Sequence, residues 1–146
     1  MTLKQICLFA LMMPITLLDM HAMASEGDIV VAVSGASRIE SISKRELIDV
    51  FMGRFDVLQN GERVQPVDYS GNPALRGTFY QRLVGKNQKQ INAYWSRLVF
   101  SGRAKPPVQV DSVQQSIRFI LDNPTGLAYL PASRVSEEMK IVLVLE

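Results

Sequence analysis

The residues best suited to ligand chemistry lie in one run near the middle of the chain, from Asp68 to Arg76. The run reads as a strand end, a turn at Ser70 and Gly71, and a helix that starts at Asn72. Such a junction leaves backbone N–H groups unpaired at the positive end of a helix dipole, which favours a bound anion. Arg76 could add a charge-assisted hydrogen bond. We therefore predict an oxyanion site formed by Ser70, Gly71, Asn72 and Arg76.

The same residues also have a purely structural interpretation. Asn72 can cap its own helix, Gly71 permits the turn, and Arg76 can be a solvated residue of the first helical turn. Pro73 suits the first position of a helix, but it has no N–H to offer an anion. Both interpretations fit the sequence.

A second candidate site follows the first expected strand, where Ser34, Gly35 and Ser37 form a small polar loop that runs into Arg38. The loop lacks the Gly-Lys-Ser/Thr ending of a nucleotide-binding loop, so nucleotide binding is not expected. An ordinary connecting loop is the simpler explanation of these residues.

Residues 1–24 have the composition of a signal peptide. Lys4 supplies the positive n-region, Ile6–Leu18 the apolar core, and Ala22–Ala24 an A-x-A site, so we predict cleavage before Ser25. The apolar stretch is too short to span a bilayer. An uncleaved N-terminal anchor is the alternative. The prediction is a soluble, exported periplasmic protein whose single domain covers residues 25–146.

Removal of this segment would also remove the one histidine of the chain, His21, and its one cysteine, Cys7. The remaining domain would lack a Ser-His-Asp triad, a thiol nucleophile and the usual zinc ligands. Neither an enzyme nor a metal or cofactor site is therefore expected. Four carboxylates show no catalytic spacing and are interpreted as solvated surface charges: Asp49, Asp56, Glu62 and Asp68.

The net charge of +2 comes from basic residues scattered along the chain, which argues against nucleic acid as a partner. Arg97, Arg103 and Lys105 form one local basic group, and they suit the negative end of a helix dipole. The sequence carries no signal for an oligomeric state.

Four helices are predicted from capping residues that precede apolar positions at helical spacing. The third has the clearest amphipathic pattern, with an inward stripe that we assign to the core: Ile91, Tyr94, Trp95, Leu98 and Val99. The expected helix starts are Ser43 with Glu46, Asn72 with Pro73, Asn87 with Gln90, and Asp111 with Gln114.

Four short apolar runs predict strands at 28–34, 64–69, 127–130 and 141–145. Asn60-Gly61 indicates a turn that could close a small hairpin, and Lys105–Pro107 reads as an extended connector. Strands alternating with helices predict an α/β class: a single-domain layered fold with a mostly buried sheet flanked by about four helices.

Several segments, in order along the whole domain, together resemble a known family. They are LIDVFMG at 47–53, QPV at 65–67, Ser70-Gly71, Phe79-Tyr80, AYWSRLVFSGR at 93–103, and NPTGLAYLP at 123–131. This combination resembles the small phosphate ABC transporter substrate-binding-like proteins of the type 2 periplasmic binding superfamily.

The resemblance implies an exported bacterial protein built as about one lobe of a type 2 periplasmic binding fold. Full-length members bind phosphate between two lobes, with a Ser-Gly-Thr turn at a helix start and an arginine shortly before it. Ser70 and Gly71 match that turn, whereas Asn72 replaces the threonine and residues 67–69 contain no arginine. Phosphate or a similar oxyanion is the implied ligand, and a membrane transporter or receptor the implied partner. The alternative function is a non-transport interaction or sensory module that partners a membrane protein.

Overall fold

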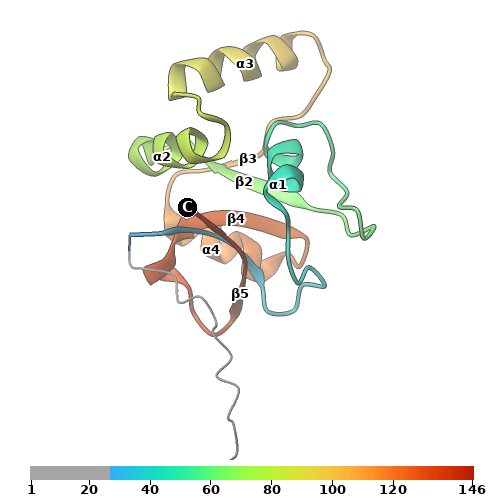
Figure 1. Ribbon diagram of the computed structural model, residues 1–146, viewed down its shortest axis with the longest axis vertical. Coiled ribbons are helices and arrows are strands. Elements are labelled where there is room, and N and C mark those ends of the chain that lie inside the picture. Colours follow the sequence, from blue (N-terminus) through green and yellow to red (C-terminus); the bar gives the residue numbers. More distant parts are fainter. Residues whose placement is uncertain (1–26) are drawn as a thin grey trace, which may run out of the picture.

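The computed structural model describes residues 27–146, so the predicted signal peptide, with His21 and Cys7, lies outside the described residues. The described chain forms one five-stranded mixed sheet in the order β3-β2-β4-β1-β5 (Figure 1). Together with four helices, this sheet confirms the predicted α/β layered fold. The strands are β1 (Ile29–Ser34), β2 (Gln65–Tyr69), β3 (Val108–Val110), β4 (Gly126–Pro131) and β5 (Met139–Leu145).

Strand direction divides the sheet into two parts. β3, β2 and β4 run parallel, whereas β1 is antiparallel to both of its neighbours, β4 and β5. β1 is buried along its whole length, as its uninterrupted apolar sequence predicts for a strand covered on both faces. Ile29 pairs with Leu145, so β1 begins beside the point where β5 ends.

The four helices are α1 (Lys44–Phe51), α2 (Pro73–Val84), α3 (Gln88–Phe100) and α4 (Val113–Asp122). At α1 the Ser43 hydroxyl accepts a hydrogen bond from the N–H of Glu46, whose carboxylate accepts from the N–H of Ser43. This completes the predicted capping box. Asn87 and Gln90 make the same pair of bonds at α3. Gly85 ends α2 in the left-handed conformation, with a φ of 66°.

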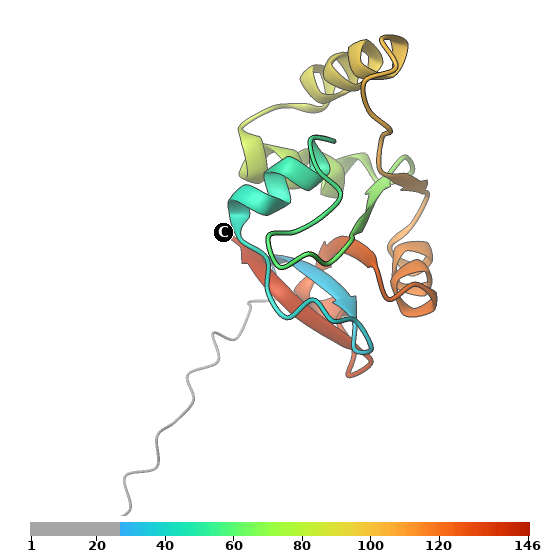
Figure 2. The same cartoon turned by 90° about the vertical axis from the view of Figure 1, so that its right-hand side faces the viewer.

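α1 and α2 cover one face of the sheet and α4 covers the other (Figure 2). Alternation along β2 gives the same division, because Asp68 contacts Tyr80 of α2 whereas Tyr69 contacts Ser116 of α4. α3 lies beyond α2 at one end of the molecule in both views, and segment 101–107 returns from it to the sheet. Within residues 27–146, every helix is too short or too polar to cross a membrane.

Trp95 anchors α3 to the rest of the molecule and is 7% exposed. Its indole lies against Gly53, where an added Cβ would come within 2.6 Å of the ring and where the φ of 70° also favours glycine. Tyr94 donates a hydrogen bond to the carbonyl oxygen of Met52 at 2.6 Å. The core assignment of Trp95 is confirmed. That of Val99 is wrong, because Val99 lies one turn past this contact and is 52% exposed.

The segment between α3 and α4 departs from prediction in two ways. Val108–Val110 pairs with β2 as a fifth strand, where a connector alone was expected; three residues after two prolines are too few to display a strand pattern. α4 is capped by Ser112, whose hydroxyl accepts from the N–H of Gln115, rather than by the predicted pair Asp111 and Gln114. The Asp111 carboxylate instead accepts a hydrogen bond from the Ser70 hydroxyl at 2.7 Å.

The Asn60-Gly61 turn is present, and Gly61 has a φ of 85°. The residues around it form only an isolated bridge between Val57 and Arg63, so the possible hairpin is reduced to a single pair. Asp56 and Arg63 form an exposed ion pair across this segment at 2.6 Å.

Candidate functional site

The carboxyl ends of the parallel strands β2 and β3 lie side by side, and each is followed by a turn and a helix start. Gly71 of the β2–α2 turn packs directly on the backbone of Asp111 in the β3–α4 turn. A Cβ atom on Gly71 would overlap the Asp111 carbonyl oxygen. Only glycine therefore allows the two turns to approach this closely. The contact brings the N-terminal ends of α2 and α4 together at the carboxyl ends of β2 and β3.

The predicted oxyanion residues of the turn are partly engaged within the protein. The Ser70 hydroxyl lies 2.7 Å from Asp111 Oδ1 and 3.3 Å from the Val110 carbonyl oxygen. Asn72 Oδ1 accepts from the N–H of Leu75 at 3.2 Å, which is the structural capping role. The backbone N–H groups of Gly71, Asn72 and Ala74 have no hydrogen-bond acceptor among residues 27–146. These three N–H groups remain available to an anion.

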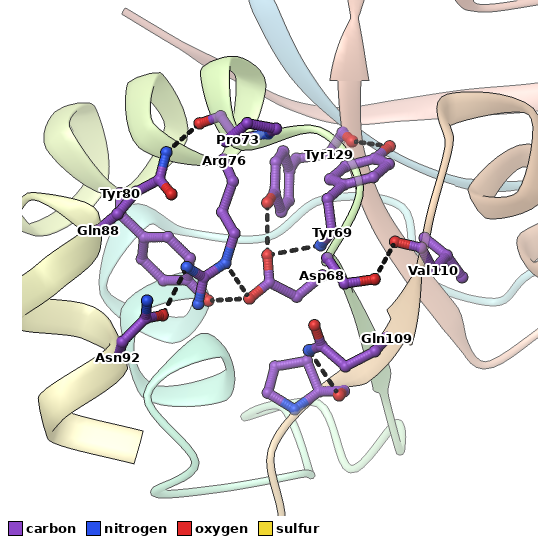
Figure 3. A network of polar contacts seen from close by, with 12 residues as sticks. Asp68, Tyr69, Pro73, Arg76, Tyr80, Gln88, Asn92, Gln109, Val110 and Tyr129 are labelled. Atoms are coloured by element: carbon purple, nitrogen blue, oxygen red, sulfur yellow. Dashed lines mark hydrogen bonds and ion pairs between the residues drawn. The ribbon is translucent and has the colours of Figure 1, made fainter. Parts of the chain in front are cut away.

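Arg76 points away from this turn (Figure 3). Its Nε donates to Asp68 Oδ2 at 3.0 Å, and Nη1 donates to Asn92 Oδ1 of α3 at 2.9 Å. The guanidinium also lies 5.2 Å from the centre of the Tyr80 ring. The Arg76 side chain is only 12% exposed, so it is not the solvated first-turn residue of the structural interpretation. The structure brings Ser70, Gly71 and Asn72 together and directs Arg76 elsewhere.

Asp68 is the centre of a buried network, and its prediction as a solvated surface charge is wrong. The side chain is 1% exposed. Its carboxylate accepts hydrogen bonds from the Tyr129 hydroxyl at 2.5 Å, the Tyr69 N–H at 2.8 Å and the Tyr80 hydroxyl at 3.0 Å, besides the ion pair with Arg76. We call these five residues the Asp68 cluster. The carboxylate is buried because β2 presents it to the face that α2 covers.

The tyrosines of the Asp68 cluster have raised pKa values. Burial raises the pKa of Tyr69 to about 12. Burial, reinforced by the negative charge of Asp68, also raises the pKa of Tyr80 and of Tyr129. All three hydroxyls remain protonated at neutral pH, so those of Tyr80 and Tyr129 keep donating to the carboxylate, while that of Tyr69 donates to the Tyr129 carbonyl oxygen. Arg76 supplies the compensating charge.

A pocket of about 360 Å³ adjoins the cluster, and its lining comes from α2, α3, β2, β3 and the connector before β3. Its polar lining residues are Asp68, Arg76, Asn92, Ser96 and Gln109. The Trp95 indole N–H is buried and has no hydrogen-bond partner of good geometry among residues 27–146. The predicted turn residues do not line this pocket, so Arg76 faces a separate concavity.

The second candidate site consists of Ser34, Gly35 and Ser37 and follows the carboxyl end of β1. Because β1 is antiparallel to β4, and β4 is parallel to β2, this end of β1 lies at the amino ends of the parallel strands, opposite the first candidate. The Ser34 hydroxyl accepts from the N–H of Ala36, and the Ser37 hydroxyl from the N–H of Ile39. Both serines are buried, at 5% exposure. The structure thus places this loop away from the first candidate and uses its hydroxyls to shape the loop.

Two of the other carboxylates that were interpreted as surface charges, Asp49 and Asp56, form ion pairs with arginines. Asp49 forms an ion pair with Arg54 at 2.9 Å at the end of α1. Residues 27–146 contain no group of three or more His, Cys, Asp or Glu side chains placed to hold a metal ion.

The described fold is similar to about half of each of two solved structures of phosphate ABC transport proteins. It matches an ABC-type phosphate transport receptor from Vibrio cholerae with a TM-score of 0.61 and 12% sequence identity, covering 79% of this chain and 45% of that chain. A phosphate ABC transporter substrate-binding protein with bound phosphate from Clostridium perfringens gives the same TM-score and identity over 79% and 44%. This chain spans less than half the length of either structure. No family model and no curated protein matches the sequence.

Sequence reasoning missed Asp68 and Asn92 as partners of Arg76. One signal was present: Asp68 stands between Val67 and Tyr69 in an apolar strand, where alternation favours a buried position on one face or the other. Its side-chain partners could not be identified, because they come from α2 and β4, which meet only in the folded protein.

Proposed function

We propose that this protein is a solute-binding-like lobe that binds a small oxyanion, phosphate or a close analogue, at the start of α2. The observation that carries the proposal is that three N–H groups at the N-terminus of the twelve-residue helix α2 have no acceptor among the described residues 27–146: those of Gly71, Asn72 and Ala74. They lie at the carboxyl ends of parallel strands, the edge where open α/β sheets bind ligands. The bound phosphate in the Clostridium perfringens structure supports phosphate as the ligand class.

The neighbouring carboxylate favours an anion that carries a proton. Asp111 Oδ1 lies 2.7 Å from the Ser70 hydroxyl, beside the proposed site. Phosphate at neutral pH retains at least one proton that can be donated to Asp111, whereas sulfate has none and would be repelled. We therefore expect phosphate to bind more tightly than sulfate.

Binding should be weak. The charge of Arg76 is already neutralised by Asp68, so its long-range attraction for an anion is small. One lobe also leaves part of the ligand in water. Charge-assisted bonds worth roughly 1.5 to 3 kcal/mol each must offset association costs of several kcal/mol, so we expect a Kd on the order of 10 µM to 1 mM.

Amide chemical shifts provide the direct test. Millimolar phosphate should move the N–H signals of Gly71, Asn72 and Ala74, while the signals of the Ser34–Ser37 loop serve as an internal control. Asp111→Asn should narrow the difference between phosphate and sulfate. If neither anion moves the three amide signals, the oxyanion proposal fails.

Export is a separate part of the proposal. The signal-peptide features of residues 1–24 favour a soluble periplasmic protein. Cleavage would remove His21 and Cys7, which favours a protein without enzymatic activity. Intact mass of the protein in the periplasmic fraction should correspond to a chain that starts at Ser25. Recovery only as full-length, membrane-bound material would contradict export.

One observation favours the second candidate function, an interaction or sensory module for a membrane protein. The charge of Arg76, the cation predicted to attract the ligand, is taken up by Asp68, and Asn92 holds its Nη1. The module function therefore becomes the better account if the anion titration shows no binding.

A further inference from the structure

The segment from residue 69 to residue 110 has a charge pattern unlike the rest of the chain. Between Asp68 and Asp111 the sequence contains no Asp or Glu, but it contains seven Lys or Arg residues. Two of the seven, Arg76 and Arg82, donate hydrogen bonds to internal acceptors. The other five are exposed and make no ion pair or side-chain hydrogen bond within residues 27–146: Lys86, Lys89, Arg97, Arg103 and Lys105.

The same segment exposes apolar side chains at the end of α3. Phe100 is 97% exposed and Val99 is 52% exposed. They stand among the free cations Arg97, Arg103 and Lys105, and we call these five residues the α3 tip. α3 lies at one end of the molecule in both views (Figures 1 and 2). The dipole of α3 accounts for some of the nearby charge, but it does not explain a fully exposed aromatic residue.

We propose that the α3 tip docks the protein on an anionic lipid surface. Phe100 would enter the headgroup region, where aromatic side chains are stabilised, and Arg97, Arg103 and Lys105 would lie beside lipid phosphates. A segment with five exposed cations that lack internal partners, and with no carboxylate, is complementary to such a surface. A helix end and one turn offer little area for a stable protein interface, which takes about 800 Å² per partner, whereas a lipid surface needs no matching pocket.

Vesicle co-sedimentation tests the proposal with the chain from Ser25 onward, which contains every described helix and strand. The protein should sediment with vesicles of equal parts phosphatidylglycerol and phosphatidylcholine, and not with phosphatidylcholine alone. Phe100→Ser should lower the partition coefficient about tenfold. Ile141→Ser removes a 41%-exposed apolar residue from β5 and should leave the partition coefficient unchanged.

Two further variants separate local charge from net charge. Arg97→Gln with Arg103→Gln should weaken vesicle binding by about tenfold or more, at roughly fivefold per cation. Lys44→Gln with Arg118→Gln removes the same charge from exposed positions on α1 and α4 and should have little effect. All four positions are exposed, so the melting temperature should not change.

Insertion of residue 100 into the lipid is measured directly with Phe100→Trp. The fluorescence of this second tryptophan should shift to shorter wavelength when the protein binds anionic vesicles. Equal binding to both vesicle types, or unchanged binding in the Phe100 and arginine variants, would overturn the proposal. Self-association that Phe100→Ser abolishes, without vesicle binding, would overturn it as well and assign the α3 tip to a second copy of the chain.

Discussion

Replacing Arg76 with glutamine would remove the cation that pairs with the buried carboxylate of Asp68. The two side chains are 12% and 1% exposed, so water screens their interaction little. Removing one partner of a buried ion pair costs about 3–5 kcal/mol. Three neutral donors, from Tyr69, Tyr80 and Tyr129, would still hold the carboxylate. We therefore expect Arg76→Gln to lower the free energy of unfolding by about 2–4 kcal/mol.

Arg54→Gln is the matched control. Arg54 and Asp49 form an ion pair of nearly the same length, 2.9 Å against 3.0 Å, but the Arg54 side chain is 59% exposed. An exposed pair of this kind contributes about 0–1 kcal/mol. Urea unfolding of both variants can be followed by the fluorescence of Trp95, the one tryptophan of the chain. Unchanged m-values would show that both midpoints report stability alone.

A double-mutant cycle decides whether the effect arises from the pair itself. Combined with Asp68→Asn, the Arg76→Gln variant should show a coupling energy of at least about 1 kcal/mol. Strict additivity, or equal destabilisation by Arg76→Gln and Arg54→Gln, would refute the argument that burial makes the Asp68 pair strong.

Three other substitutions and one titration follow from the packing. Trp95→Ala should cost about 3–5 kcal/mol, and a variant that melts within a few degrees of the parent would contradict the core position of the indole. Gly53→Ala should lower the free energy of unfolding by about 2–4 kcal/mol, because the φ of Gly53 is left-handed and the new Cβ would lie 2.6 Å from Trp95. Gly61→Ala has the same kind of φ but open space around it, so it should lower this free energy by only about 1 kcal/mol. Thermal melting measures both variants. The tyrosine pKa values are higher in the folded state than in the unfolded chain, where tyrosine loses its proton near pH 10. The stability that these tyrosines contribute should therefore be constant below pH 10 and fall as the pH rises, for Tyr69 until its folded pKa of about 12 is reached. The slope should be about 1.4 kcal/mol per pH unit for each tyrosine of the Asp68 cluster, and an unchanged urea midpoint between pH 10 and pH 11 would contradict it.

Local signals in the sequence predict most of the helices and the central strands. Ser43 with Glu46, and Asn87 with Gln90, act through neighbours three residues away, so their capping bonds do not depend on the rest of the fold. β1 is apolar throughout, which predicts burial on both faces without knowledge of its partners. These elements were identified because their physical causes are local.

The candidate site depends on contacts that sequence spacing does not encode. Asp68 has the appearance of a surface charge until Arg76, Tyr80 and Tyr129 converge on it from α2 and β4. β3 is a strand only because it pairs with β2. The predicted turn did form, but the direction of the Arg76 side chain is set by Asp68 on β2 and by Asn92 on α3, sixteen residues later in the chain. Tertiary contacts therefore decide which predicted ligand residues remain available.

The pairing of Ile29 with Leu145 places the beginning and the end of the folded domain next to each other. In engineering terms, the domain can be inserted into a surface loop of a host protein, with both junctions leaving from one point. A short peptide could also join these two ends of the domain, and new chain termini could then be opened at the exposed turn Asn60-Gly61. The domain is thus suited to serve as a cassette that is joined to a host protein through a pair of adjacent strands.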